Sequence, residues 1–98
     1  MRWMAFLWLV ACAAEGPEPS VRALVPAQAR PGEMVEIQGR GFAPLEDGFV
    51  AFGVEACGVV MWEDERIRVR VPTMHPGATT VVVTVDGRQS EPVRFEIE

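Results

Sequence analysis

The sequence predicts an all-β domain built as a sandwich of about seven short strands. Apolar and polar residues alternate with period two through most of the chain, which is the pattern of strands with one buried face. Glycine, proline and aspartate interrupt these stretches about every 8–12 residues, as turns do in immunoglobulin-like sandwiches. Hydrophobic residues make up 49% of the 98 positions, and no long helix-forming run occurs outside the N-terminus. One small immunoglobulin-like domain over residues 21–98 is therefore expected.

The first half of this domain contains three expected strands. Residues 21–25 form the first strand and end at Pro26, and Pro31-Gly32 suits a type II turn with proline second and glycine third. The next strands are expected over residues 34–38 and residues 49–52. The residues predicted to point inward from these two strands are Val35, Ile37, Val50 and Phe52.

The second half continues the same pattern. Short strands are expected over residues 57–62, 66–71, 79–85 and 93–97. Asp86-Gly87 predicts a type I′ hairpin, because both central residues of such a turn need positive φ. The residues predicted to lie on one face of the last three strands are Ile67, Val69, Val71, Val81, Val83, Val85, Val93, Phe95 and Ile97.

These motifs, taken in order, resemble the IPT/TIG domain family. They are Pro26, Pro31-Gly32, the stretch from Val35 to Phe42, the stretch from Val50 to Gly53, the stretch from Ile67 to Pro72, Gly77 and the strand from Val81 to Val85. The resemblance covers residues 21–98 and implies an immunoglobulin-like fold. Such domains occur in plexins, in some transcription factors and in many bacterial surface and secreted proteins. It also implies a role as a spacer or recognition unit.

Two glycines and a phenylalanine after the 34–38 strand have an expected structural role. Gly39 and Gly41 are predicted to let the chain leave the strand in a conformation barred to residues with a Cβ atom. Phe42 is then expected to turn back and close the end of the core. Gly53 and Pro72 are expected to end their strands in a similar way.

The N-terminal segment predicts export and lipid attachment. Arg2 precedes a continuous apolar run over residues 3–11, which matches a secretory signal and is too short to span a bilayer. The last residues of that run, with Cys12, form the sequence Leu-Val-Ala-Cys and resemble a bacterial lipobox. We therefore expect residues 1–11 to be a signal peptide, Cys12 to carry lipid, and residues 12–20 to form an extended tether. The resemblance implies a cell-envelope location, and Ala13 after the cysteine implies the outer membrane where a cell has two membranes.

The two cysteines allow two interpretations. Cys12 becomes a lipid thioether and Cys57 stays a lone, buried thiol, or the leader is retained and the two residues form a disulfide. The first interpretation is preferred, because Cys12 adjoins the apolar run and lies outside the strand pattern. The two cysteines do not have metal-ligand spacing.

The charge of the chain argues against general nucleic-acid binding. The net charge is −5, and all nine cations are arginines. An acidic domain gains little from a polyphosphate partner. A DNA-binding role like that of TIG-containing transcription factors is therefore the weakest of the alternatives.

No catalytic or cofactor site is expected. His75 is the single histidine and lies in a proline- and glycine-flanked turn, while Ser20 and Ser90 have no recognisable base. The acidic residues 63–65, with residues 46–47, are expected to be solvated loop charges, because calcium needs more oxygen ligands at a regular spacing.

The candidate binding surface lies on and before the 66–71 strand. Arg66, Arg68 and Arg70 project from one face and are suited to an anionic lipid headgroup or polysaccharide, unless cross-strand glutamates such as Glu36 or Glu55 balance them. Trp62 is expected to be partly buried, and where exposed it would be an interface residue. The expected function is a non-enzymatic, membrane-anchored binding module for an envelope protein or polysaccharide. The alternative is a structural spacer.

Overall fold

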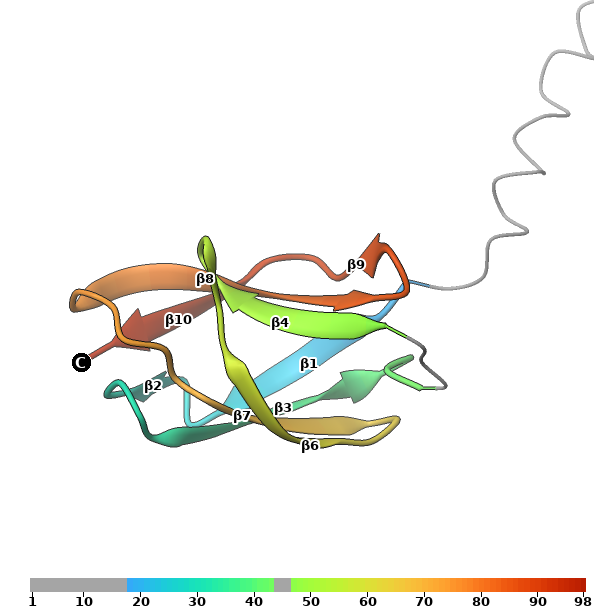
Figure 1. Ribbon diagram of the computed structural model, residues 1–98, viewed down its shortest axis with the longest axis horizontal. Coiled ribbons are helices and arrows are strands. Elements are labelled where there is room, and N and C mark those ends of the chain that lie inside the picture. Colours follow the sequence, from blue (N-terminus) through green and yellow to red (C-terminus); the bar gives the residue numbers. More distant parts are fainter. Residues whose placement is uncertain (1–17, 44–46) are drawn as a thin grey trace, which may run out of the picture.

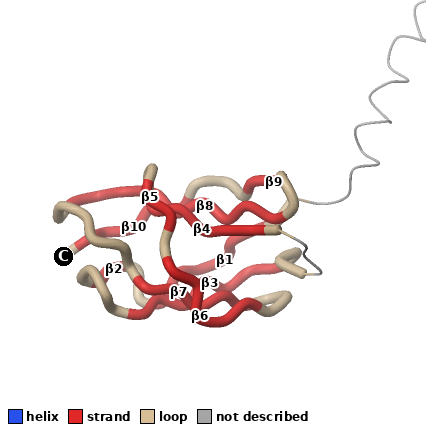
Figure 2. The backbone as a smooth tube through the Cα atoms, viewed as in Figure 1, coloured by secondary structure: helices blue, strands red, loops and turns tan. Residues whose placement is uncertain are grey.

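The computed structural model describes residues 18–43 and 47–98, which form two facing β-sheets (Figure 1). The predicted signal peptide, Cys12 and most of the predicted tether lie outside these described residues. The strands are β1 (Ser20–Val25), β2 (Gln28–Ala29), β3 (Met34–Arg40), β4 (Gly48–Phe52), β5 (Glu55–Ala56), β6 (Gly58–Trp62), β7 (Arg66–Arg70), β8 (Gly77–Val85), β9 (Arg88–Gln89) and β10 (Val93–Ile97). Strands and loops account for all of the described chain (Figure 2), which contains no helix able to cross a membrane.

The expected all-β sandwich is confirmed. One sheet has the order β1-β3-β7-β6, and the other has the order β2-β10-β8-β4-β5 with β9 paired to β8. Neighbouring strands are antiparallel except for β10 and β2. The seven longer strands of the described chain correspond to the seven that the sequence predicts. Three further strands, β2, β5 and β9, have two residues each and are too short to show an alternating pattern.

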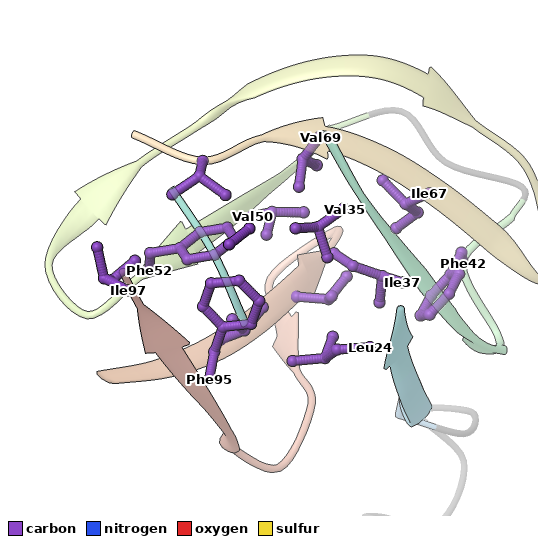
Figure 3. Packing of buried hydrophobic residues seen from close by; sticks show 14 of the residues in the cluster. Leu24, Val35, Ile37, Phe42, Val50, Phe52, Ile67, Val69, Phe95 and Ile97 are labelled. Carbon is purple, nitrogen blue, oxygen red and sulfur yellow. The ribbon is translucent and has the colours of Figure 1, made fainter. Parts of the chain in front are cut away.

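The core lies between the two sheets and is built from the alternating residues (Figure 3). Side chains of β3, β4, β7, β8 and β10 meet there, and the rings of Phe52 and Phe95 pack edge to face with their centroids 5.2 Å apart. The buried hydrophobic residues are Leu24, Ala29, Val35, Ile37, Phe42, Val50, Phe52, Ile67, Val69, Val71, Val81, Val83, Val85, Phe95 and Ile97. Of the predicted inward residues, Val93 alone is only partly buried.

Both predicted turns are present. Glu33 N donates to Arg30 O at 3.1 Å, and Gly32 between them has a φ of 90°, as the third residue of a type II turn requires. Asp86 and Gly87 have φ values of 48° and 86°, which are those of a type I′ turn. The hairpin therefore joins β8 directly to β9.

The strand after the hairpin is interrupted, which the sequence pattern does not indicate. Gln89 pairs with Thr84, whereas Val93 pairs with Val81, so the register shifts by one residue between β9 and β10. At this shift the buried Ser90 donates its backbone N–H to Val83 O at 2.8 Å. Its hydroxyl accepts the N–H of Val83 at 2.9 Å and so replaces a backbone carbonyl.

Gly41 confirms the expected need for glycine, and Gly39 requires a correction. Gly41 has a φ of 79°, a conformation that favours glycine. Gly39 is not among the residues with positive φ. Glycine is needed there for lack of space, because a Cβ atom at this position would collide with the carbonyl oxygen of Ser20 and the ring of Phe42. Phe42 is fully buried at the end of the core, as expected.

Candidate binding face

The outer face of the β1-β3-β7-β6 sheet carries most of the arginines that the sequence singles out. Arg66 and Arg68 alternate with buried Ile67 and Val69, so their side chains project away from the core. The antiparallel register places Glu36 opposite Arg68 and Gln38 opposite Arg66. We call this outer surface, with Arg22 on β1, the binding face.

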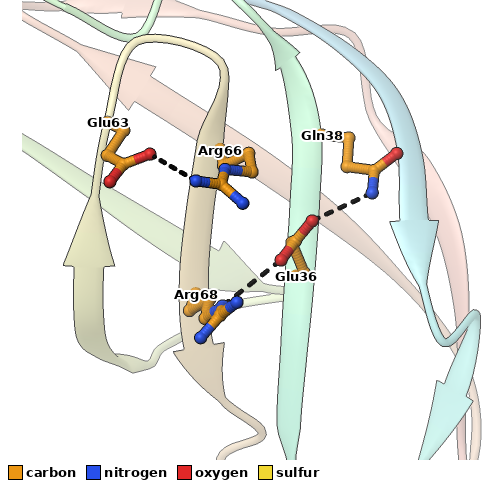
Figure 4. A network of polar contacts seen from close by, with 5 residues as sticks. All are labelled: Glu36, Gln38, Glu63, Arg66 and Arg68. Atoms are coloured by element: carbon orange, nitrogen blue, oxygen red, sulfur yellow. Dashed lines mark hydrogen bonds and ion pairs between the residues drawn. The ribbon is translucent and has the colours of Figure 1, made fainter.

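A network of polar contacts organises the binding face (Figure 4). Arg68 Nε lies 3.2 Å from Glu36 Oε1, and Gln38 Nε2 donates to Glu36 Oε2 at 2.9 Å. Arg66 Nη2 lies 3.0 Å from Glu63 Oε1, so a second arginine is also paired. Exposed pairs of this kind add little to stability, so the network describes how the side chains are arranged rather than what stabilises the sheet.

Glu36 is the centre of this network. Both of its carboxylate oxygens accept a hydrogen bond, one from Gln38 and one from Arg68. The hydrogen bond from Gln38 and then that from Arg68 lower the pKa of the Glu36 carboxyl below its ordinary value. Glu36 therefore balances Arg68 across the strand pair, which was one of the two alternatives for the arginine row, but it does not pair with Arg66 or Arg70. Glu55 lies in β5 of the other sheet.

Two hollows lie side by side on the binding face. The first hollow is polar and is lined by Arg22, Glu36, Gln38, Arg66 and the acidic residues 63–65. The second hollow is lined by Val25, Met34, Val35, Glu36 and Arg68. Glu36 borders both, so the two hollows adjoin at this side chain, and we call the pair the depression.

Arg70 differs from the other two arginines of its strand. Its Nη1 donates a 3.1 Å hydrogen bond to the carbonyl oxygen of Gly32, in the turn before β3. It lines neither hollow. Of the predicted row of three arginines, the structure brings Arg66 and Arg68 into the depression and assigns Arg70 to the support of a turn.

Trp62 lies on the opposite side of its strand from the binding face. It pairs with the buried Ile67, packs against the core and is partly buried, as expected. Its Nε1 donates to Phe42 O at 2.7 Å, so the polar atom of the indole already has a partner. Met61, which pairs with Arg68, takes the place on the outer face.

Arg22 and Gln38 line the first hollow and were missed by the sequence analysis, as were Val25 and Met34 in the second. For Gln38, Val25 and Met34 the signal is the register of β1 and β3 beside β7, because neighbouring strands place their outer residues side by side. Arg22 lies at the bulge between Val21 and Ala23, which the alternating pattern does not indicate.

Asp64, one of the acidic residues 63–65, accepts hydrogen bonds from the loop that follows β3. Asp64 Oδ1 accepts the N–H of Ala43 at 3.1 Å, and the Asp64 carbonyl accepts that of Phe42 at 3.1 Å. Within residues 18–43 and 47–98, no three His, Cys, Asp or Glu side chains come together as a metal site. Glu46 lies outside the described residues.

His75 is exposed and borders a separate shallow hollow with Val54 and Met74.

Cys57 is a free thiol and is half-buried rather than buried. Its Sγ lies 3.4 Å from the carbonyl oxygen of Val50, to which it donates. Burial raises the pKa of this thiol from 9.0 to about 11, so it stays protonated and is a poor nucleophile at neutral pH.

Comparison with known families decides what kind of domain this is. A model of the IPT/TIG domain matches residues 19–97. The chain belongs to the IPT/TIG domain family. The resemblance carried by the glycine, proline and strand motifs is thereby confirmed.

The similar proteins are much longer than this chain. A cyclomaltodextrin glucanotransferase of Paenibacillus macerans is 38% identical over 69 residues, which are 67% of this chain and 10% of that protein. The crystal structure of gamma-CGTase from alkalophilic Bacillus clarkii has a TM-score of 0.78 and 32% identity, over 84% of this chain and 12% of that one. The chain thus spans about a tenth of the length of these relatives.

Another solved structure shares the fold at lower identity. SGBP-B from a complex xyloglucan utilization locus in Bacteroides uniformis has a TM-score of 0.64 and 17% identity, over 80% of this chain and 23% of that one. At this identity the likeness shows the shared sandwich fold alone.

Proposed function

We propose that this IPT/TIG domain is a non-enzymatic binding module of the bacterial cell envelope. In this proposal Cys12 carries the lipid anchor, and a polysaccharide or an envelope protein docks on the binding face. The observation that supports it best is the network around Glu36, which holds charged side chains in place beside an open depression. Preorganised polar groups lose little conformational entropy when they bind a partner.

The similar proteins favour a polysaccharide over a protein partner. Enzymes at 35–38% identity are named for cyclomaltodextrin, which is a carbohydrate. SGBP-B comes from a xyloglucan utilization locus. A domain shared by such proteins is well suited to a role beside carbohydrate, whatever the rest of each chain does.

The surroundings of Cys57 and Ser90 support a binding role over catalysis. Burial keeps the Cys57 thiol protonated, and the Ser90 hydroxyl is buried as an acceptor for Val83 N–H. Neither residue has His75 as a hydrogen-bond partner. A nucleophilic enzyme needs a base within hydrogen-bond distance of its nucleophile.

The anchor can be tested separately from the binding face. Replacement Cys12→Ser should abolish incorporation of labelled palmitate and move the protein from the membrane fraction to the soluble fraction. Two or more acyl chains anchor a protein stably, so the shift should be nearly complete. Unchanged membrane association of the variant would contradict the proposed anchor.

The binding role can be tested by charge reversal at Arg68. Replacement Arg68→Glu places a carboxylate opposite Glu36 and should weaken retention of the protein by a purified envelope polysaccharide by about tenfold or more. Arg94→Glu is the matched control, because Arg94 is exposed on β10 of the other sheet and has a loose pair with Glu96 at 3.9 Å. Equal retention of both variants and the wild type would contradict a role for the binding face.

A spacer is the second candidate function, and one observation favours it. The described chain enters the sandwich at one end and leaves it at Glu98 at the other (Figure 1). A domain with separated ends adds its full length between the segments that it joins. If the spacer is the correct function, neither Arg68→Glu nor Arg94→Glu will alter any interaction of the full-length protein.

A further inference from the structure

The binding face carries an inference about the chemical class of its ligand, which rests on the proposed function. We propose that the binding face takes a neutral polysaccharide, with sugar hydroxyls in the first hollow and the apolar faces of sugar rings against Val25 and Met34 in the second. This proposal differs from the sequence-based expectation of an anionic partner for the arginine row.

The charge of the first hollow opposes an anionic ligand. Four of its lining side chains are carboxylates and two are guanidinium groups, Arg22 and Arg66, which gives a net charge of −2 (2 − 4). The arginines of β7 do not reverse this balance. Glu63 pairs with Arg66, Glu36 pairs with Arg68, and Arg70 is bound to the Gly32 carbonyl. A polymer of carboxylates or sulfates would meet uncompensated negative charge.

The first hollow offers both donors and acceptors to a ligand. Arg22 has no ion-pair or hydrogen-bond partner among residues 18–43 and 47–98, so its guanidinium is free to donate. Gln38 uses its amide nitrogen on Glu36, which leaves its carbonyl oxygen free to accept. A sugar hydroxyl both donates and accepts, so a neutral polyhydroxylated ligand matches this mixed lining.

The second hollow supplies the apolar contact that a sugar ring needs. Val25 is 49% exposed and Met34 is 41% exposed, and both line the second hollow beside Glu36 and Arg68. One face of a pyranose ring consists mainly of C–H groups, which gain from contact with such side chains. Because Glu36 borders both hollows, the depression fits a ligand several sugars long better than a single sugar.

The experiment compares neutral and anionic polymers with the full-length protein. Mobility is measured in native gels that contain amylose or xyloglucan as neutral probes, or polygalacturonate or heparin as anionic probes. Amylose or xyloglucan should retard the wild type, and the anionic polymers should not. The double variant Arg22→Ala/Gln38→Ala should lose about tenfold or more in affinity for the neutral probe. Arg94→Ala, on the other sheet, should bind as the wild type does.

A second pair of variants tests the charge argument directly. Glu63→Gln/Glu65→Gln removes two negative charges from the first hollow and brings its net charge from −2 to 0 (2 − 2). Because less negative charge then opposes an anionic ligand, polygalacturonate should retard this variant more than it retards the wild type. Circular dichroism of each variant ensures that a loss of binding is not a loss of fold.

The possible outcomes separate this inference from the proposed function. Preferential retardation of the wild type by polygalacturonate or heparin would overturn the neutral-ligand inference and leave the binding module intact. Absence of retardation by all four polymers would overturn the inference as well. The proposed function would then depend on whether Arg68→Glu removes an envelope protein that co-purifies with the wild type. Failure of that test and of the palmitate test would overturn the proposed function itself.

Discussion

The indole Nε1 of Trp62 donates a 2.7 Å hydrogen bond to the carbonyl oxygen of Phe42, 20 residues earlier in the chain. Phe42 lies after the end of β3, and its ring closes one end of the core. The bond therefore ties the end of β6 to the loop that leaves β3, and it keeps the indole turned toward the core rather than toward the binding face.

Trp62→Phe tests the contribution of this bond. The phenyl ring keeps most of the packing but cannot donate, so the Phe42 carbonyl loses its partner. We expect the free energy of unfolding to fall by about 1–2 kcal/mol in urea titrations followed by circular dichroism. Binding to a polysaccharide should stay as in the wild type, because Trp62 is not on the binding face. A variant as stable as the wild type would show that the bond contributes nothing.

Gly39→Ala tests whether position 39 of β3, next to β1, has room for a side chain. The added methyl group would collide with the Ser20 carbonyl and the Phe42 ring, and overpacking of this kind costs about 1–3 kcal/mol or prevents folding. Gly58→Ala is a matched control in β6, because a Cβ atom there meets nothing within 4 Å. Its effect should be about 0.5 kcal/mol or less. Equal thermal midpoints for the two variants would refute the explanation for Gly39.

Ser90→Ala tests the bulge between β9 and β10. The change leaves the buried N–H of Val83 without the hydroxyl that accepts it, and an unsatisfied buried donor costs about 1–3 kcal/mol. Thr80→Ala, an exposed change in the same strand β8, should cost about 0.5 kcal/mol or less. Hydrogen exchange at Val83 should accelerate in the serine variant only.

Cys57 should be unreactive in the folded protein. Its raised pKa of about 11 leaves almost no thiolate at neutral pH, so iodoacetamide should modify it slowly until urea unfolds the chain. Because the folded pKa of Cys57 lies above the ordinary value of 9.0, the folded state keeps the thiol proton more tightly than the unfolded state does. The free energy of unfolding therefore keeps its full value below pH 9.0 and falls as the pH rises through about 11. Mass spectrometry measures the modification, and equal rates in the folded and the urea-unfolded protein would contradict this environment.

Glu36→Gln tests the centre of the polar network through pH. The folded pKa of Glu36 is lowered, so its contribution to stability is present above the ordinary value of 4.5 and is lost as the pH falls through the folded value. The stability difference between wild type and Glu36→Gln should therefore be largest at neutral pH and should shrink in acid. Denaturation curves at several pH values measure it, and a difference that does not depend on pH would rule out the charged form as the cause.

The alternating residues predicted the fold because each strand has one buried face. Val35, Ile37, Val81 and Val83 all lie in the core as expected, and Pro31-Gly32 and Asp86-Gly87 make the expected turns. These features are local, so a few neighbouring residues are enough to determine them.

The candidate site was only partly predictable, because it depends on which strands become neighbours. The exposure of Arg66 and Arg68 follows from alternation, whereas the place of Arg22 and Gln38 beside them depends on the pairing of β1, β3 and β7. Trp62 illustrates the same limit. The register shift between Val59 and Met61 in β6 brings Met61, rather than Trp62, opposite Arg68.

The arrangement of the two ends of the sandwich has a mechanical consequence. β1 belongs to one sheet and β10 to the other, and the chain enters and leaves at opposite ends (Figure 1). Tension applied between these two ends would pull both strands lengthwise against β3 and β8. Such shear strains all the hydrogen bonds of a strand pair at once, whereas peeling breaks them one at a time. The two terminal strands are therefore arranged so that such tension would load their hydrogen bonds in parallel rather than in sequence.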